Sequence, residues 1–80
     1  MKATVLIRPK EGILDPQGEA VGDALRALGF AVSAARVGRL VDVDLDTDDA
    51  AEARNALDRM SAELLANPLI ESFTIVLDGD

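Results

Sequence analysis

The sequence contains no cysteine and no histidine, and its aromatic residues are limited to Phe30 and Phe73. The chain therefore cannot form a disulfide bond, a zinc site of the usual nitrogen and sulfur ligands, a thiolate nucleophile or an imidazole general base. Apolar runs stay well short of the roughly 18 residues of a membrane helix, and the pattern of a secretory signal peptide is missing. We therefore expect a cytoplasmic protein that has no membrane partner.

Positive charge is also scarce, with 8 Lys and Arg against 15 Asp and Glu and a net charge of −7. A polyanion would be bound against this repulsion and without aromatic rings for its bases, so we expect no nucleic-acid partner. The aspartates between residues 42 and 49 lack the glycine and the closing glutamate of a calcium loop. Gly12 and Gly18 belong to no phosphate-binding motif. We expect no catalytic, metal-binding or cofactor-binding residue in this chain.

The hydrophobic pattern predicts two strands and two helices in a single domain, residues 1–80. Alternating residues predict strands over 2–8 and 69–77. Asp15 followed by Pro16 predicts a capped helix over about 16–28, and Asp49 with Glu52 predicts a second helix over about 49–66. Asn67 and Pro68 end this second helix, because the residue before a proline avoids the helical region.

Residues 30–46 fit two arrangements, a hairpin or one long bent strand. We favour the hairpin, with Gly38 and Arg39 as its two-residue loop. The order is then β-α-β-β-α-β. It predicts an α+β fold, a two-layer ferredoxin-like sandwich whose antiparallel sheet carries two helices on one face.

The other face of this sheet displays four aliphatic residues, more than a small monomer usually leaves in water. They are Leu6, Val37, Leu40 and Val76. We expect them to mediate self-association into a homodimer or a dimer of dimers, whereas scattered surface aliphatics would need no partner. Gly18 and Gly22 lie one turn apart in the first helix, where they either allow close approach of another backbone or are tolerated helix glycines.

Arg36 and Arg39 are two guanidinium groups close together in an acidic protein. Such groups bind carboxylates and other anions through paired hydrogen bonds, so we expect a contact with a partner subunit. The alternative is that both pair with neighbouring aspartates in the same chain.

Four segments of the sequence together resemble the PurS family, the small subunit of phosphoribosylformylglycinamidine (FGAM) synthase. The similarity spans nearly the whole chain. It rests on Leu14-Asp15-Pro16-Gln17-Gly18, on Ala24-Leu25 with Leu28-Gly29-Phe30, on Arg36-Val37-Gly38-Arg39, and on Leu64-Leu65-Ala66-Asn67-Pro68 before Ile70-Glu71.

The resemblance implies a non-catalytic subunit of an ATP-dependent ligase of purine biosynthesis. That ligase converts formylglycinamide ribonucleotide and glutamine to FGAM and glutamate. The family's small subunit is expected to bridge the glutaminase subunit and the large synthetase subunit and to assist ammonia transfer, while the large subunit uses ATP and Mg²⁺. The positions carried over as interface or structural candidates are Asp15, Pro16, Gln17, Gly18, Arg36, Gly38, Arg39, Asn67 and Pro68.

A second hypothesis is a stand-alone regulatory module that binds a small molecule, as ACT domains do. Ferredoxin-like domains of this length serve both purposes, so the fold alone does not separate them.

Overall fold

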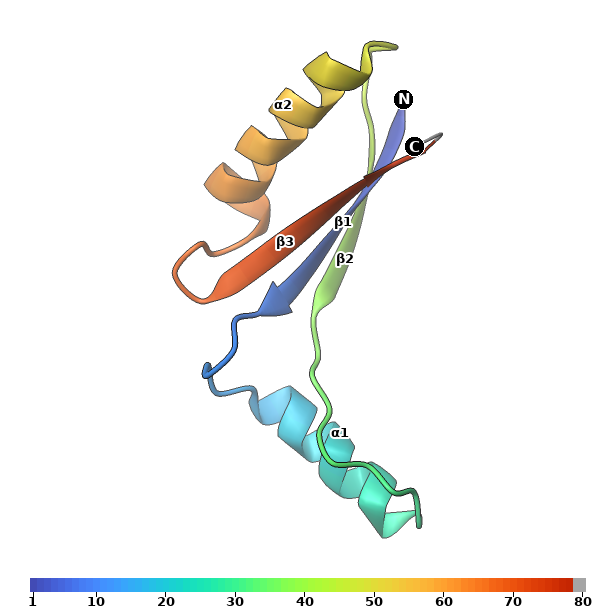
Figure 1. Cartoon of the computed structure of the whole chain (residues 1–80), viewed down its shortest axis with the longest axis vertical. Helices are drawn as coiled ribbons and strands as arrows, with labels where there is room; N and C mark the ends of the chain where they lie inside the picture. Colours follow the sequence, from blue (N-terminus) through green and yellow to red (C-terminus); the bar gives the residue numbers. More distant parts are fainter. Residues whose placement is uncertain (79–80) are drawn as a thin grey trace.

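The computed structural model describes residues 1–78 and has three strands and two helices (Figure 1). The last two residues of the predicted domain lie outside the described part. The elements are β1 (Lys2–Pro9), α1 (Pro16–Ala27), β2 (Arg39–Asp44), α2 (Ala50–Met60) with a π-helical extension, η1 (Ser61–Leu65), and β3 (Glu71–Leu77). The first and last strands in sequence, β1 and β3, and both helices confirm the sequence prediction within a few residues.

The strands form one antiparallel sheet in the order β2-β1-β3. In the centre, Val5 lies opposite Val41 on one side and Ile75 on the other. Alternate residues of β1 point toward α2, so Ala3, Val5 and Ile7 are buried. This face packs on the buried side of α2, which consists of Ala53 and Leu57. The fold is thus α+β and of ferredoxin-like type, as predicted.

The favoured hairpin is wrong. Residues 30–38 form no strand, and the chain passes straight through Gly38 into β2. A two-residue hairpin that begins with glycine needs a positive φ there, but among the described residues only Gly12 and Gly29 have one. The chain is straight because the segment before β2 is tied to the start of α1, as described below. The other arrangement, one long bent strand over residues 30–46, matches the path of this segment. It does not match the strand pairing, because only residues 39–44 belong to the sheet.

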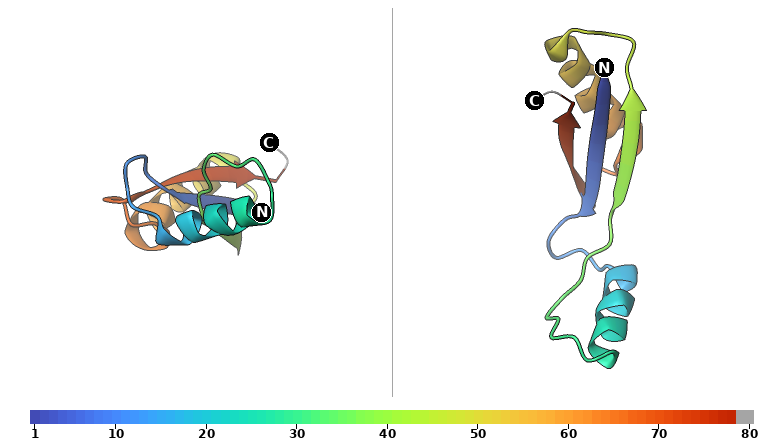
Figure 2. Two further views of the ribbon diagram at one scale, coloured as in Figure 1. Left: turned by 90° about the horizontal axis from the view of Figure 1, so that it is seen from below. Right: turned by 90° about the vertical axis from the view of Figure 1, so that its right-hand side faces the viewer.

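The placement of α1 also differs from the prediction. Figures 1 and 2 show α1 beyond the end of the sheet, where it covers neither sheet face, while α2 alone lies over the strands. Apolar side chains of this helix are exposed as a result, with Val21 at 42% and Leu28, at the C-terminal end, at 74%. Only one of the two helices therefore covers the sheet, whereas two were predicted. The molecule is elongated and measures 47 × 26 × 14 Å.

The second helix ends in the π-helical η1, in which Leu64 is 83% exposed. The π-helical turn of η1 adds one residue to the helix, which rotates later residues around its axis. Leu65 therefore packs against the core in place of Leu64. No helix within residues 1–78 is long and apolar enough to cross a bilayer.

Candidate functional site

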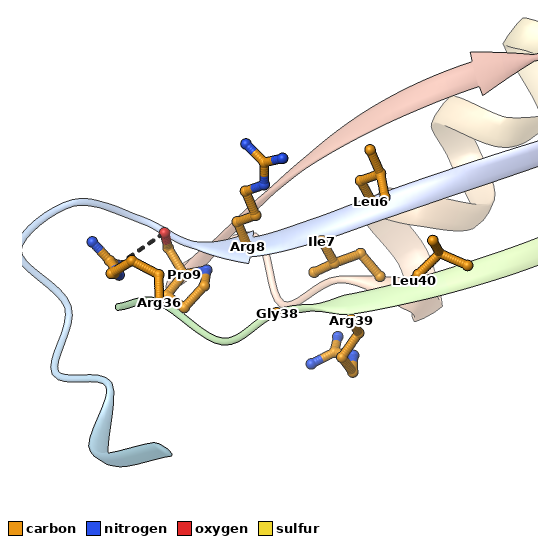
Figure 3. Close-up of a pocket in the computed structure, with 8 residues that line it drawn as sticks. All are labelled: Leu6, Ile7, Arg8, Pro9, Arg36, Gly38, Arg39 and Leu40. Carbon is orange, nitrogen blue, oxygen red and sulfur yellow. Dashed lines mark hydrogen bonds between the residues drawn. The ribbon is translucent and has the colours of Figure 1, made fainter. Parts of the chain in front are cut away.

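Most of the residues selected from the sequence lie where β1 ends and β2 begins. Residues 6–9 of β1 and residues 36 and 38–40 line an open cavity of about 530 Å³ at this end of the sheet (Figure 3). Arg36 lies on one side of this cavity and Arg39 on the other. Residues 1–78 contain no cluster of three or more acidic, histidine or cysteine side chains that could hold a metal ion.

Asp15 connects the start of α1 to the segment before β2. Its Oδ1 caps the helix by accepting a hydrogen bond from the Gly18 backbone N–H at 3.0 Å. Its Oδ2 accepts one from the Val37 N–H at 2.9 Å. The N–H of Val37, then that of Gly18, and the charge of Arg36 hold the pKa of Asp15 below its ordinary value, because each favours the carboxylate.

Arg36 fixes the same segment to the end of β1. Its guanidinium donates hydrogen bonds to the backbone carbonyl oxygens of Pro9 at 3.1 Å and Lys10 at 2.9 Å. Its Nε lies 3.8 Å from Oδ2 of Asp15. The side chain of Arg36 therefore contacts the backbone where the chain leaves β1.

Gly18 and Gly22 form the face of α1 that touches residues 31–37. A side chain at Gly18 would come within 2.5 Å of the Ala35 carbonyl oxygen, and one at Gly22 would lie 3.7 Å from the Ala35 nitrogen. Both glycines are buried. Of the two interpretations, close approach of another backbone therefore holds at Gly18, where that backbone belongs to the same chain, whereas the contact at Gly22 is an ordinary one.

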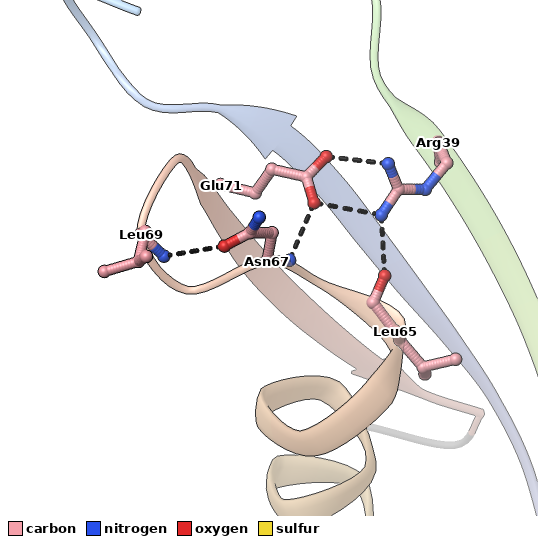
Figure 4. A network of polar contacts seen from close by, with 5 residues as sticks. All are labelled: Arg39, Leu65, Asn67, Leu69 and Glu71. Carbon is pink, nitrogen blue, oxygen red and sulfur yellow. Dashed lines mark hydrogen bonds and ion pairs between the residues drawn. The ribbon is translucent and has the colours of Figure 1, made fainter.

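Arg39 forms a second network, at the corner between η1 and β3 (Figure 4). Its two terminal nitrogens donate to the carboxylate of Glu71 at 2.7 and 3.0 Å, and one of them donates to the Leu65 carbonyl oxygen at 2.6 Å. Glu71 also accepts from the Asn67 N–H at 2.8 Å. The hydrogen bonds from Arg39, followed by that from Asn67, keep the pKa of Glu71 below its ordinary value.

The loop before β3 is ordered by short polar contacts. Asn67 Oδ1 accepts from the Leu69 N–H at 3.1 Å, and Lys10 Nζ donates to the Pro68 carbonyl oxygen at 2.7 Å. The loop presents Leu69, which is 84% exposed. Pro16 and Gln17, by contrast, lie exposed in the first turn of α1, away from this corner.

Three of the four predicted self-association residues belong to the outer sheet face, opposite α2. Leu6 lies directly across from Leu40, which is 57% exposed, and Val76 is 47% exposed. Val37 is separate from them, because it precedes β2 and is half-buried beside Asp15.

The structure places both arginines in contacts within the chain, Arg36 with two backbone carbonyls beside Asp15 and Arg39 with Glu71 and the Leu65 carbonyl, rather than with aspartates next to them in sequence. Their contact with a partner subunit stays a prediction. Sequence reasoning missed the roles of Glu71 and Lys10, which both lie far in sequence from the groups they bind. An acidic residue at the first position of a strand was the available signal for Glu71.

Comparison with known proteins gives one consistent result. The PurS family model, described as phosphoribosylformylglycinamidine (FGAM) synthase, matches residues 2–79. The Archaeoglobus fulgidus phosphoribosylformylglycinamidine synthase subunit PurS is 42% identical over 95% of this chain and 96% of its own. The structure of Thermus thermophilus PurS, 39% identical, superposes with a TM-score of 0.82 over 95% of this chain and 94% of its own. A structure of PurLQS from Thermotoga maritima contains a chain of the same fold, 24% identical, with a TM-score of 0.86 over 94% of this chain and 93% of its own.

Proposed function

Because the chain belongs to the PurS family of FGAM synthase subunits, we propose that it is the non-catalytic small subunit of such a complex in purine biosynthesis. The match of the family model to residues 2–79 carries this proposal. Other subunits then supply the chemistry. One hydrolyses glutamine, and a larger synthetase uses ATP and Mg²⁺ to convert formylglycinamide ribonucleotide to FGAM.

The composition supports this division of work. Ammonia release from glutamine in such enzymes uses a cysteine nucleophile and a histidine base, and this sequence has neither residue. Transfer of a phosphoryl group needs a nucleotide and Mg²⁺ site, for which the sequence has no motif. This chain contributes binding surfaces instead. The proposed subunit acts in the cytoplasm.

The shape of the molecule supports a bridging role between the glutaminase and synthetase subunits. The chain is 47 Å long, with α1 at one end and the sheet with α2 at the other. The ordered loop with Leu69 and the outer sheet face with Leu6 and Leu40 present separate apolar surfaces. A subunit that holds two others at a fixed distance shortens the path of ammonia between them. Self-association into a homodimer belongs to this proposal.

Reconstitution from purified subunits tests the function. We expect the three subunits together to make FGAM from glutamine, and omission of this chain to abolish most of that activity. With an ammonium salt in place of glutamine, the synthetase should keep its activity without this chain. Equal glutamine-dependent rates with and without the chain would refute the proposal. The alternative of a stand-alone amino-acid sensor is not favoured, because the family model and the relatives above are all PurS.

A further inference from the structure

Arg8 lines the cavity between β1 and β2 together with Arg36 and Arg39, but its contacts differ from theirs. Arg36 binds two backbone carbonyl oxygens, and Arg39 binds Glu71. The exposed guanidinium of Arg8 makes no hydrogen bond or ion pair to any residue within 1–78. Figure 3 shows that it extends from the side of β1 that also carries Leu6, whereas Arg39 extends from β2 in the opposite direction. The N–H donors of Arg8 are therefore available at the rim of the cavity.

Gly38 keeps the cavity open beside Arg8. A Cβ atom at residue 38 would overlap the Ile7 carbonyl oxygen and would lie 3.4 Å from the Cα of Arg8. No side chain can therefore stand where the two strands run closest, and backbone atoms form this part of the cavity wall. Leu6 and Leu40, which lie opposite each other in the register, line the cavity beside it. The cavity thus has aliphatic walls next to the guanidinium of Arg8.

Arg36 presents a second cation, which is already held in place. Both carbonyl oxygens that it binds accept hydrogen bonds from its Nη2, and its Nε lies 3.8 Å from Oδ2 of Asp15. Its Nη1 donates to no group within the described residues 1–78, so this nitrogen remains available for a ligand. Because the position of Arg36 is fixed before a ligand arrives, its side chain loses little entropy on binding.

Positive charge is concentrated at this end of the sheet. Four of the eight Lys and Arg of the chain surround the end of β1, against three acidic residues. The cations are Arg8, Lys10, Arg36 and Arg39, and the acidic residues are Glu11, Asp15 and Glu71. The nearest aspartate of β2, Asp42, lies opposite Thr4, four residues along β1 from Arg8. Four residues of strand span about 14 Å, which exceeds the Debye length of about 8 Å at physiological salt. The aspartates of β2 are therefore largely screened from an anion in the cavity.

We propose that this cavity binds a phosphate monoester. The phosphate group lies between the guanidinium groups of Arg8 and Arg36, and the organic group packs against Leu6 and Leu40. A phosphate dianion matches two cations and accepts hydrogen bonds from both, whereas a carboxylate carries one charge and is satisfied by one guanidinium fork. The cavity volume of about 530 Å³ falls within the range of roughly 300 to 1,000 Å³ that is typical of small-molecule sites.

This site goes beyond the proposed function, and its test uses the purified chain alone, so each proposal can fail while the other holds. Adenosine monophosphate (AMP) is the probe, because it joins a phosphate monoester to an organic group. Titration of the ¹⁵N-labelled chain is followed by NMR through the Gly38 and Leu40 amides and the Nε–H of Arg8. Inorganic phosphate and adenosine are titrated separately, since each supplies one half of AMP. We expect AMP to saturate the shifts of these signals at a concentration about tenfold or more below that of inorganic phosphate.

Three results of these titrations would overturn the proposal. One is the absence of saturable shifts up to about 10 mM AMP. Another is saturation by inorganic phosphate at the same concentration as by AMP, which would remove the contact of the organic group with Leu6 and Leu40. The third is saturation by adenosine at the same concentration as by AMP, which would remove the contact of the phosphate group with the arginines.

Charge variants locate the site on β1. Arg8→Gln removes a guanidinium that makes no hydrogen bond or ion pair within residues 1–78, so we expect an unchanged melting temperature and AMP binding that is weaker by about tenfold or more. Arg8→Lys keeps the charge but not the fork and should bind AMP with intermediate affinity. The matched control is Lys2→Gln, which removes one positive charge from the same face of β1, about 20 Å from Arg8, and should bind AMP like the unaltered chain. Equal affinities of Arg8→Gln and Lys2→Gln for AMP would contradict the site.

Discussion

The carboxylate of Asp15 accepts a hydrogen bond at 2.9 Å from the backbone N–H of Val37, a residue 22 positions further along the chain. The same carboxylate caps α1 through Gly18. One side chain thus starts a helix and holds the strand-like segment that returns along it. Within residues 1–78, the side chain of Asp49, the cap of α2, accepts hydrogen bonds only from the Ala51 and Glu52 N–H groups of its own helix.

This difference predicts distinct effects for two similar substitutions. Both Asp15→Ala and Asp49→Ala remove a helix cap, which typically lowers the melting temperature by about 5 °C in a domain of this size. Only Asp15→Ala also frees the Val37 amide, so its hydrogen exchange should accelerate by roughly tenfold or more. Hydrogen exchange of the Val37 amide, measured by NMR in both variants, tests this difference. Equal protection of Val37 in both variants would show that the contact contributes nothing.

Arg39→Ala should destabilise the corner between η1 and β3. The substitution removes a two-pronged contact with Glu71 and the hydrogen bond to the Leu65 carbonyl. We expect a fall of roughly 5 °C in melting temperature, and a smaller one for Arg39→Lys, which keeps the charge but not the fork. The control is Arg59→Ala, whose partner Glu63 is an exposed residue 3.6 Å away and whose loss should change little. Similar melting temperatures for both alanine variants would contradict this role.

Acid should weaken the fold through Asp15 and Glu71. Both carboxyl groups have a lowered pKa in the folded chain, so the unfolded chain takes up protons at higher pH than the folded one. Their contribution is complete above the ordinary pKa values of about 4 and is lost as the pH falls through the folded values. We expect a constant melting temperature from pH 7 to about 5 and a decline below about 4.5. Asp15→Asn with Glu71→Gln should flatten that decline, and an unchanged slope would assign it to other groups.

Leu57→Ala tests the small core. Leu57 is fully buried between α2 and the sheet, so its truncation should cost about 2 to 5 kcal/mol in urea unfolding. The control is Leu64→Ala, because that side chain is 83% exposed and its loss should cost less than about 0.5 kcal/mol. A cost for Leu64→Ala that equals that of Leu57→Ala would mean that Leu64 is buried in solution, for instance by a second copy.

Ser61→Ala should stabilise the chain. Ser61 is fully buried at the junction of α2 and η1, and its hydroxyl has no hydrogen-bond partner in the described part of the chain, residues 1–78. Burial of an unpaired hydroxyl typically costs about 1 to 3 kcal/mol, so we expect the alanine variant to unfold at higher urea. Lower stability of Ser61→Ala would show that the hydroxyl is hydrogen-bonded in solution.

The elements that the sequence predicted well are those whose signals are local. Asp15 with Pro16 and Asp49 with Glu52 mark helix starts, and alternation in β1 and β3 identifies the buried residues. The exposure of Leu64 could not be predicted, because a π-helical turn depends on packing at the end of α2 and leaves no periodic signal in the sequence.

The path of residues 30–38 could not be predicted, because its cause is not local. A glycine and an arginine between two apolar segments favour a hairpin, but the bond between Asp15 and Val37 crosses 22 residues. The same applies to the site. Arg36 and Arg39 were selected for contacts with carboxylates, but the carboxylates nearest them, Asp15 and Glu71, are 21 and 32 residues away in sequence and come near only in the folded chain.

Because α1 lies beyond the end of the sheet, a small rotation at its base displaces its far end by a larger distance. Its 12 residues span about 18 Å. Two segments of backbone connect it to the sheet, one that contains Gly12 at φ 82° and one that ends at Gly38. A rotation of about 10° at these connections would move the far end of an arm of this length by about 3 Å. Small changes near Gly12 and Gly38 are therefore amplified at Leu28 and Phe30, the apolar tip of the arm.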